Sequence, residues 1–377
     1  MLDALNDPNA LLVEAARRYA QERLAPGAAA REQAGRIEPE IVRELGEMGF
    51  LGATSGAEWG GAELPYETYA RVIEEIAAGD GSVSTVVSVH NAPTCEIFQR
   101  FGTAEQNERW FRPLASGRAV GSFALTEAGA GSDAAGIRTR AVKRGARYVI
   151  DGSKQFISNA TIGTTTILFA VTDPAAGKRG ISAFVVANDT PGFSISRVEH
   201  KLGQHASDSC ALSFDAMEVP EDQRIGAEGE GLRIALSSLE SGRIGIAAQS
   251  VGLARGALDY AVAYARERRQ GGKPIMEHQA VAFRLVDAKT RLAAARELTL
   301  KAARLKDAGQ PALEAAAMAK LFASEAAEAI CSAAIQTLGG YGYLRDYPVE
   351  RLYRDARVCQ IYEGTSDVQK LILSRML

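Results

Sequence analysis

The sequence predicts an α+β protein with an N-terminal helical domain, a central β domain and a C-terminal helical bundle. Two changes of residue pattern along the 377 residues indicate this order. Apolar residues recur at helical spacing up to about residue 119, β-type segments follow, and helical spacing returns near residue 228. A chain of this length can form two or three packed units. We therefore expect domains at 1–119, 120–226 and 227–377.

The first domain shows helical spacing in stretches that Gly- and Pro-rich turns such as EWGGAELP separate. Its opening stretch lacks the basic start and apolar core of a signal peptide, and Asp7-Pro8 leads into an amphipathic helix. The apolar positions at helical spacing are Leu11, Leu12, Ala15, Ala16 and Tyr19, then Ile41, Leu45 and Met48, then Val72, Ile73, Ile76 and Ala77.

The central domain is rich in Val, Ile, Thr and Phe, and Gly, Pro and Asp bound its segments. This pattern predicts a strand at 121–127, a hairpin at 137–152, and further strands at 164–173, 180–189, 193–198 and 209–219.

The third domain contains little Pro and three long helical stretches, at 230–270, 278–309 and 311–340. Two short turns separate them, as in an antiparallel bundle. The first stretch carries Gly242, Gly245, Gly252 and Gly256, each of which costs a helix about 1 kcal/mol relative to Ala. We therefore expect these glycines to mark close contacts between helices.

Composition narrows the possible classes of protein. The chain is 46% hydrophobic and 24% charged, as globular proteins usually are. Its net charge of -3 argues against an electrostatic nucleic-acid binder, and no apolar run reaches the roughly 18 residues of a membrane span. We expect a cytoplasmic protein with no nucleic-acid partner and no membrane span. No CxxC or HxxxH occurs, so we expect ordinary thiols and no metal site.

A Gly-rich segment, ALTEAGAGSDAAG at 124–136, could bring the backbone close to a bulky ligand. Gly129 and Gly131 leave room for such a ligand, and Thr126 and Ser132 offer hydroxyl groups. The segment does not form a strand–GxGxxG–helix unit, which argues against a Rossmann site. On composition alone, a plain Gly-rich loop is the alternative.

Two segments near the C-terminus also could carry chemistry. The glycines of QTLGGYGYLRDYP at 336–348 could simply end a bundle helix. QIYEGTSDVQK at 360–370 places Glu363 just before a short apolar helix, where Ser366 and Gln369 match a capping box. The residues alone leave two possibilities for Glu363: a turn residue near a favourable helix dipole, or a catalytic carboxylate.

These segments, in this order along nearly the whole chain, resemble the acyl-CoA dehydrogenase family. ALTEAGAGSDAAG is similar to the family's first signature, and the stretch from QTLGGYGYLRDYP through YEGTSDVQK to its second. The stretches SLESGRIGIAAQSVGLA and MAKLFASEAA are most similar to short-chain and branched-chain members. The resemblance implies a β-barrel-like central domain and a C-terminal four-helix bundle, with FAD bound between them.

The resemblance also implies a reaction. The family introduces a trans double bond between C2 and C3 of an acyl-CoA thioester, and Glu363 matches its catalytic base. Its backbone N–H resembles one donor to the thioester oxygen, and a flavin ribityl hydroxyl is expected to be the other. Exclusion of water should raise the pKa of Glu363 towards the working pH. Electron-transfer flavoprotein is the expected partner, and this chain is expected to form a homotetramer.

Further site residues follow from the same resemblance. The residues expected to bind substrate are Ser132, Glu240, Arg243, Tyr362 and Gly364. The residues expected to line the flavin are Phe123, Leu125, Thr126, Gly131, Ser132, Phe156, Ile157, Ser158, Thr365, Ser366 and Asp367. Those expected to reach the FAD of a neighbouring subunit are Arg268, Gln279, Gln336, Thr337, Leu338, Gly339 and Gly340. For Glu240 and Arg243, a solvated ion pair and a buried structural Arg are the alternatives.

Three positions distinguish the chain from some relatives. Gly242 stands where some carry the base on the long helix, which leaves that role to Glu363. Ser84 stands where glutaryl-type members carry an Arg, which favours an uncharged acyl tail. Gly271 replaces a large aromatic residue near a neighbour's flavin, which predicts weaker retention of FAD. The alternative functions are the same reaction on a carrier-protein thioester, a flavin oxidase or monooxygenase of this fold, and a non-catalytic binding protein.

Overall fold

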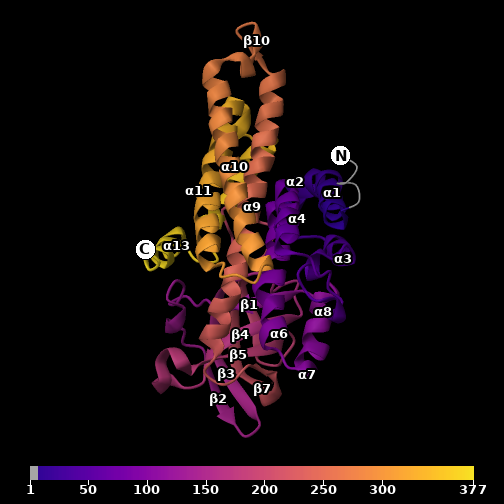
Figure 1. Cartoon of the computed structure of the whole chain (residues 1–377). Coiled ribbons are helices and arrows are strands. Elements are labelled where there is room, and N and C mark those ends of the chain that lie inside the picture. Colours follow the sequence, from indigo (N-terminus) through magenta and orange to yellow (C-terminus); the bar gives the residue numbers. More distant parts are fainter. Residues whose placement is uncertain (1–6) are drawn as a thin grey trace.

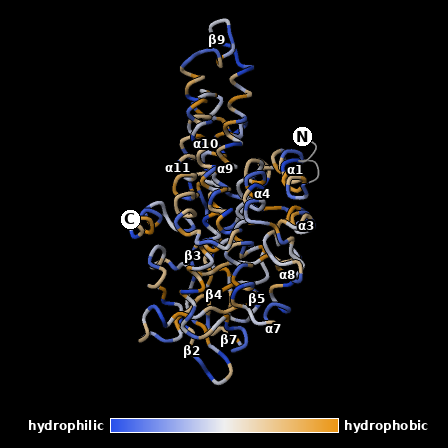
Figure 2. The backbone as a smooth tube through the Cα atoms, in the orientation of Figure 1, coloured by the Kyte–Doolittle hydropathy of each residue, from blue (hydrophilic) through white to orange (hydrophobic). Residues whose placement is uncertain are grey.

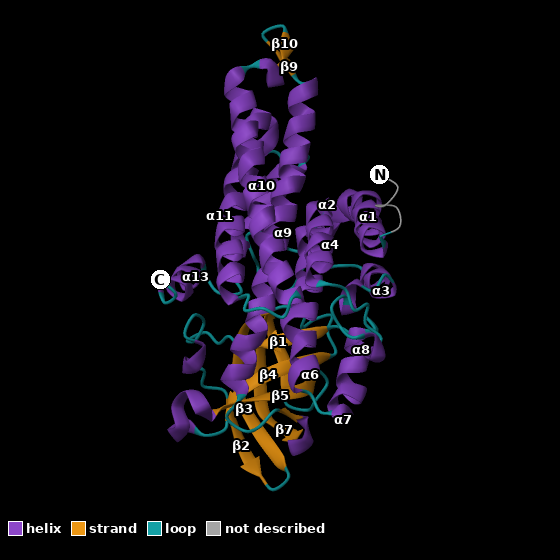
Figure 3. Ribbon diagram, viewed as in Figure 1, coloured by secondary structure: helices purple, strands orange, loops and turns teal. Residues whose placement is uncertain are grey.

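The structure is a computed structural model, which describes residues 7–377 of the chain. Figure 1 shows a bundle of long helices, a sheet at one end of the bundle, and the N-terminal helices packed along its side. Figure 3 shows that the strands gather in one part of the molecule and that helices make up the rest. The predicted α+β fold is confirmed. The domain boundaries at 119/120 and 226/227 stay a prediction.

The N-terminal helices begin where the sequence provides caps. The Asp7 side chain accepts a hydrogen bond from the N–H of Asn9, and Pro8 occupies the first helical position. The first six residues of the stretch analysed for a signal peptide lie outside the described residues. The helices of this part are α1 (Pro8–Tyr19), α2 (Ala25–Ala34), α3 (Pro39–Glu47), α4 (Tyr66–Gly79), α5 (Gly81–Val89), α6 (Glu96–Phe101), α7 (Ala104–Gln106) and α8 (Arg112–Ala115).

All the predicted strands are present in one eight-stranded sheet. Its order is β6-β7-β3-β2-β4-β5-β8, and β1 pairs in parallel with β4. Alternate residues of β4 face two different cores, since Ile167 and Phe169 pack in one cluster and Leu168 and Ala170 in another. The strands are β1 (Gly121–Ala124), β2 (Arg140–Arg144), β3 (Arg147–Ile157), β4 (Thr165–Val171), β5 (Ile181–Ala187), β6 (Phe193–Val198), β7 (Cys210–Pro220) and β8 (Arg224–Ile225).

The C-terminal bundle is built on α9 (Gly231–Glu267), α10 (Gln279–Asp307) and α11 (Leu313–Leu338), with the shorter α12 (Pro348–Arg357) packed against α9 and α11. A further helix, α13 (Ser366–Ser374), follows. The glycines of α9 do mark close contacts: a Cβ atom on Gly256 would lie 2.8 Å from the carbonyl oxygen of Ala78. The sequence did not predict the hairpin of β9 (Arg269–Gln270) and β10 (Lys273–Pro274) between α9 and α10.

Hydrophobic residues concentrate in the strands of the sheet and on the inner faces of the bundle helices (Figure 2). None of the helices within residues 7–377 combines the length and the apolar character that a membrane crossing requires. The four cysteines are buried and free. Across the same residues, no group of three or more His, Cys, Asp or Glu side chains is arranged to hold a metal ion.

Candidate active site

Glu363 lies in a tight turn that two buried side chains hold in place. Its φ is 54° and that of Gly364 is 87°, so two consecutive residues adopt the left-handed conformation. The Lys320 ammonium, from α11, donates to the carbonyl oxygen of Gly364 at 2.7 Å. The Gln369 amide, from α13, donates to the carbonyl oxygens of Gly364 at 2.8 Å and Glu363 at 3.2 Å. The turn is therefore fixed from two helices.

The Glu363 carboxylate lies in a setting suited to a general base. Its Oε2 atom is buried and has no hydrogen-bond partner within the described residues. Burial raises the pKa of Glu363 to about 7, although the positive charges of Arg243 and Lys320 act to lower it. A carboxyl group with a pKa near neutrality can both accept and release a proton at the pH of the cell.

The cap of α13 differs from the predicted one. Thr365, not Ser366, is the N-cap residue, and its side chain accepts a hydrogen bond from the N–H of Val368 at 3.2 Å. The capping box of Ser366 and Gln369 is therefore wrong by one residue. Gln369 instead binds the turn, and Ser366 Oγ is buried without a partner among residues 7–377.

Tyr362 anchors the other side of the turn. Its hydroxyl donates to Gln249 Oε1 at 2.5 Å, and the Gln249 amide donates to the hydroxyls of Thr85 at 2.7 Å and Ser84 at 2.9 Å. Gln204 joins the same network, donating to the Tyr362 hydroxyl at 3.3 Å. Ser84, which stands in place of an Arg, is thus buried within this neutral network.

The two segments predicted to line a flavin lie side by side. The N–H of Gln155 donates to the carbonyl oxygen of Thr126 at 2.9 Å. The Lys154 ammonium is buried and donates to the carbonyl oxygen of Leu125 at 2.9 Å and to Glu127 Oε1 at 2.8 Å. These bonds join the Gly-rich loop after β1 to the end of β3.

This region leaves room beside its backbone and presents an aromatic ring, which suits a flat aromatic cofactor. A Cβ atom on Gly129 or Gly131 would meet nothing within 4 Å. Phe156 is 62% exposed at a positive φ of 61°, so its ring is presented outside the core. The side chains of Leu125 and Ile157, by contrast, pack in the cores of this domain, so only their backbones can contact a ligand. The residues present therefore fit FAD.

A chain of contacts links this region to Glu363. Asn159, which directly follows Ser158, donates from its side chain to the carbonyl oxygen of Val86 at 3.3 Å. Thr85, the residue before Val86, accepts a hydrogen bond from Gln249, which in turn accepts one from Tyr362. These contacts connect the region of the first signature with the Glu363 turn.

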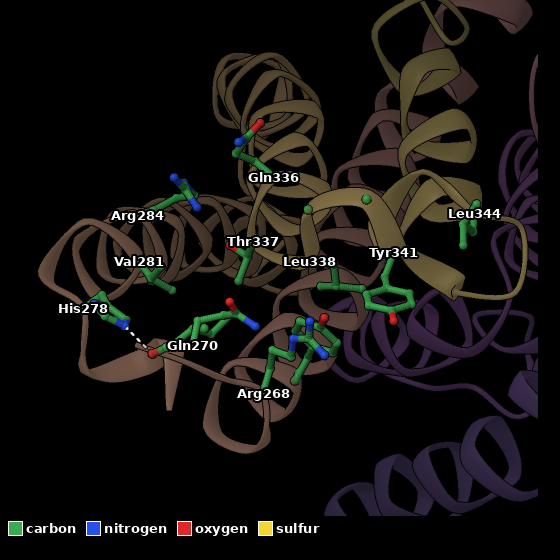
Figure 4. Close-up of a pocket in the computed structure, with 14 residues that line it drawn as sticks. Arg268, Gln270, His278, Val281, Arg284, Gln336, Thr337, Leu338, Tyr341 and Leu344 are labelled. Carbon is green, nitrogen blue, oxygen red and sulfur yellow. Dashed lines mark hydrogen bonds between the residues drawn. The ribbon is translucent and has the colours of Figure 1, made fainter. Parts of the chain in front are cut away.

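A second set of predicted residues lines a groove of about 530 Å³ elsewhere on the molecule. Figure 4 shows Arg268, Gln336 and Tyr341 around it. The Arg268 guanidinium lies over the Tyr341 ring, 5.5 Å from its centre. The groove-lining residues are Tyr264, Arg268, Gln270, Ile275, His278, Val281, Arg284, Gln336, Thr337, Leu338, Gly339, Gly340, Tyr341 and Leu344. Gln279, also predicted here, is exposed at the start of α10 and does not line the groove.

The groove is far from Glu363 within one chain. Lys320 marks the Glu363 turn and Leu338 lines the groove, and α11 rises about 27 Å between them at 1.5 Å per residue. Figure 1 accordingly shows β10 at the end of the bundle opposite to the sheet. The residues predicted to bind FAD thus form two separate sets.

Glu240 and Arg243 differ in their surroundings. Glu240 forms an ion pair with Lys306 at 3.7 Å and is partly exposed. Arg243 is 5% exposed, and its Nε atom has no partner within the described residues. Burial lowers the pKa of Arg243, and the charges of Glu363 and Glu240 oppose this shift. Of the two residues, Arg243 therefore fits better the alternative of a buried structural cation, and it lies beside Glu363.

Sequence reasoning missed Lys320, Gln369 and Lys154 as supporting residues. Lys320 has a signal in the sequence, because it is a single charge within the apolar helical run AAAMAKLFA. Burial lowers its pKa to about 8. Lys154 and Gln369 have no such signal, since their partners are long-range backbone carbonyls or belong to a turn.

Comparison with known proteins gives matches along almost the whole chain. Residues 6–118 match the N-terminal domain of acyl-CoA dehydrogenases, residues 122–217 the middle domain and residues 229–377 the C-terminal domain. The chain is 42% identical over 368 residues to the short/branched chain specific acyl-CoA dehydrogenase of Rattus norvegicus mitochondria, covering 98% of this chain and 85% of that protein.

Two solved structures are similar in fold and sequence. Butyryl-CoA dehydrogenase from Megasphaera elsdenii superposes with a TM-score of 0.96 and 38% identity, covering 98% of each chain. A structure described as electron transferring flavoprotein of Acidaminococcus fermentans superposes with a TM-score of 0.96 and 41% identity, covering 98% of this chain and 97% of that one.

Proposed function

We propose that the chain converts a short or branched acyl-CoA into the trans-2-enoyl-CoA. The chain belongs to the acyl-CoA dehydrogenase family of flavin-dependent oxidoreductases. The observation that carries the proposal is the buried Glu363 carboxylate, whose pKa is raised to about 7 in a turn held by Lys320 and Gln369. In this proposal Glu363 removes the α-proton.

FAD, when bound, supplies a hydride acceptor, which no side chain offers. The chain's contribution is to hold the cofactor and to exclude water. The Gly-rich loop around Thr126, the end of β3 around Ser158 and the cap residue Thr365 would hold the cofactor beside Glu363, with Phe123, Gly131, Ser366 and Asp367 nearby. Their proximity rests on the bonds from Gln155 to Thr126 and from Asn159 to Val86.

The turn also offers donors for a thioester oxygen. The N–H groups of Glu363 and Gly364 have no hydrogen-bond acceptor among residues 7–377. The carbonyl oxygen of Glu363 accepts a hydrogen bond from Gln369, so the peptide group that carries the N–H of Gly364 has a fixed orientation. Fixed donors stabilise the negative charge that develops on that oxygen as the α-proton leaves. We assign substrate contacts to Ser132, Tyr362 and Gly364, and CoA contacts to Glu240 and Arg243.

The assembly we propose is a homotetramer in which each FAD touches two subunits. The separation of about 27 Å along α11 supports a shared site. Within one chain, a single cofactor site cannot include both the residues near the Glu363 turn and the residues that line the groove. Electron-transfer flavoprotein is the proposed acceptor, in keeping with the similarity to the Acidaminococcus structure.

Anaerobic mixing of the FAD-loaded protein with acyl-CoA thioesters tests the proposal. Butyryl-CoA and isobutyryl-CoA should bleach the flavin absorbance, because Ser84 provides no positive charge for an acidic tail. Glutaryl-CoA should react with a lower kcat/KM. A colourless protein, or a flavin that no thioester bleaches, would contradict the proposed function.

A further inference from the structure

A closed ring of hydrogen bonds holds the Tyr362 hydroxyl next to the Glu363 turn. The Thr85 hydroxyl donates to Gln204 Oε1 at 2.6 Å, and the Gln204 amide donates to the Tyr362 hydroxyl at 3.3 Å. The Tyr362 hydroxyl donates to Gln249 Oε1 at 2.5 Å, and the Gln249 amide donates to the Thr85 hydroxyl at 2.7 Å. These side chains come from α5, the loop between β6 and β7, the turn itself and α9. The ring therefore joins four separate elements.

Two backbone carbonyl groups fix the direction of this ring. The Gln249 amide nitrogen also donates to the carbonyl oxygen of Gly81, at 3.1 Å. The Gln204 amide nitrogen also donates to the carbonyl oxygen of Asp355, at 3.1 Å. Because a carbonyl oxygen only accepts, each amide must turn its nitrogen towards it. The Tyr362 hydroxyl then gives its single hydrogen to Gln249 and has none left for a substrate.

The loop that contributes Gln204 also holds the turn after β3. This β6–β7 loop consists of residues 199–209. Its Asp208 carboxylate accepts hydrogen bonds from the N–H of Asn159 at 2.5 Å and from the N–H of Thr161 at 2.6 Å. Asn159 directly follows the segment at the end of β3 that is predicted to line the flavin. One loop therefore contacts both the end of that segment and the side chain next to the base.

Internal bonds brace the β6–β7 loop. The N–H of Glu199 donates to the carbonyl oxygen of Ser209 at 2.8 Å, which closes the loop at its base. The Lys201 ammonium donates to the carbonyl oxygen of Ser207 at 2.8 Å. A Cβ atom on Gly203 would lie 2.4 Å from a backbone carbonyl oxygen of α12, so the loop packs tightly on that helix. The loop is therefore a stiff connection between the β domain and the bundle.

We infer that Gln204 is a positioning residue for the reaction, which fixes the Glu363 turn relative to the part of the β domain proposed to hold FAD. The inference rests on the proposed function and adds a residue to it. Gln204 is 3% exposed and acts through Tyr362, the neighbour of Glu363 in the chain. A base and a hydride acceptor must reach adjacent carbons of one substrate, so a small displacement of either lowers the rate.

The test is anaerobic stopped-flow reduction of the FAD-loaded protein by butyryl-CoA, with Gln204→Met compared with the parent. Methionine keeps an unbranched side chain of similar length but cannot replace the two bonds of the ring. The reduction rate at saturating thioester should fall by about tenfold to hundredfold, as expected for a displaced reacting group. The thioester concentration that gives half the maximal rate should change by less than about threefold, because binding of the CoA part is unaffected.

Gln106→Met is the matched control. Gln106 is likewise a buried glutamine that joins a helix to the β domain, through the carbonyl oxygens of Asp222 and Arg224. It lies outside the ring, so the reduction rate of this variant should match that of the parent.

A double-mutant cycle separates positioning from a general loss of structure. Tyr362→Phe removes only the hydroxyl that Gln204 binds. Residues that act through one bond are not additive, so adding Gln204→Met to Tyr362→Phe should slow reduction by no more than about threefold further. Should Gln204→Met fail to fold, Thr85→Val takes its place in the cycle. It nearly keeps the shape of Thr85 and removes the hydroxyl that donates to Gln204, so the same results are expected.

Three results would overturn the inference and leave the proposed function intact. The first is a Gln204→Met or Thr85→Val variant that reduces the flavin at the parent rate. The second is a pair of rate losses that multiply in the double variant. The third is a rate loss that disappears at saturating FAD, because Gln204 would then act on cofactor binding. If no thioester bleached the flavin of the parent, the proposed function would fail and the inference with it.

Discussion

The Glu363 turn and the groove at Gly339 are both built on glycines and helix ends, yet they differ in how closely other side chains pack against them. At the turn, Lys320, Gln369 and Gln249 satisfy the backbone and the neighbouring hydroxyl. At the groove, a Cβ atom on Gly339 or Gly340 would meet nothing within 4 Å. The contrast teaches that the fold itself holds the Glu363 turn in one conformation, whereas it leaves the groove open.

The largest expected effect comes from removing the base. Glu363→Gln keeps the size of the side chain but cannot accept the α-proton. Positioned general bases contribute typically 10²–10⁴-fold, so flavin reduction should slow by at least about 10²-fold. FAD binding should persist, because the proposed cradle around Thr126 and Ser158 is unchanged. The measurement is anaerobic stopped-flow bleaching with saturating acyl-CoA.

Glu240→Gln is the comparison for that variant, since Glu240 is the next carboxylate on α9 and pairs with Lys306. Its effect on the reduction step should be much smaller than that of Glu363→Gln. Bleaching of Glu363→Gln within tenfold of the parent rate would show that the base is misassigned and make Glu240 the next candidate.

The sequence predicted the strands and long helices better than it predicted the details of the Glu363 turn. The strands and the long helices follow from composition and periodicity, and the prediction of close contacts at the α9 glycines is confirmed, as at Gly256 and Ala78. The cap at Thr365 was missed because Ser366 and Gln369 fit the capping-box pattern better than Thr365 and Val368 do. The roles of Lys320 and Gln369 depend on where distant helices meet, which local spacing does not encode.

Moving the base to α9 is the second test of preorganisation at the turn. The double variant Glu363→Gly with Gly242→Glu should reduce the flavin at least about tenfold faster than Glu363→Gly alone. This gain is a small part of what a positioned base contributes. A Cβ on Gly242 points at the present carboxylate, from 2.7 Å, and the first substitution frees that space. The left-handed φ of residue 363 suits glycine. Stopped-flow rates of the double variant equal to those of Glu363→Gly would show that the two positions do not reach the same carbon.

Lys320→Met should shift the pH dependence of the reaction. Glu363 accepts a proton only when ionised, so flavin reduction should rise with pH through about 7 and level off above it. The Lys320 charge lowers the pKa of Glu363, so its loss should move the midpoint to higher pH. A shift of one pH unit corresponds to about tenfold less ionised base below the midpoint.

The matched control for that variant is Lys370→Met, since Lys370 is an exposed lysine of α13 that pairs with Glu325. Its midpoint should coincide with that of the parent. An unchanged or lower midpoint for Lys320→Met would contradict the electrostatic role, even if the rate fell through a looser turn.

At the groove, Arg268→Ala should weaken retention of FAD by about tenfold, as expected for the loss of one charge-assisted hydrogen bond. The rate of reduction at saturating FAD should change little, because Glu363 is far away. The control is Arg266→Ala, since Arg266 is an exposed arginine in the last turn of α9 and does not line the groove; this variant should retain FAD like the parent. Sedimentation should show a tetramer, and an FAD-saturated active monomer would refute the shared site.

The smallest effect is expected at Gly271, where the structure changes the prediction from sequence. Gly271 and Gly272 form the turn of the β9–β10 hairpin with φ values of 58° and 81°, so Gly271 is required by the turn and is not merely a missing aromatic residue. Gly271→Phe could gain about 1–3 kcal/mol of apolar contact, but a left-handed backbone costs other residues about 1–3 kcal/mol. FAD affinity should therefore stay within about threefold of the parent, since these two terms nearly cancel. Gly271→Asn, which tolerates this conformation, isolates the backbone cost. Equilibrium dialysis of FAD measures both variants, and tightening by more than tenfold in Gly271→Phe alone would show that the aromatic contact dominates.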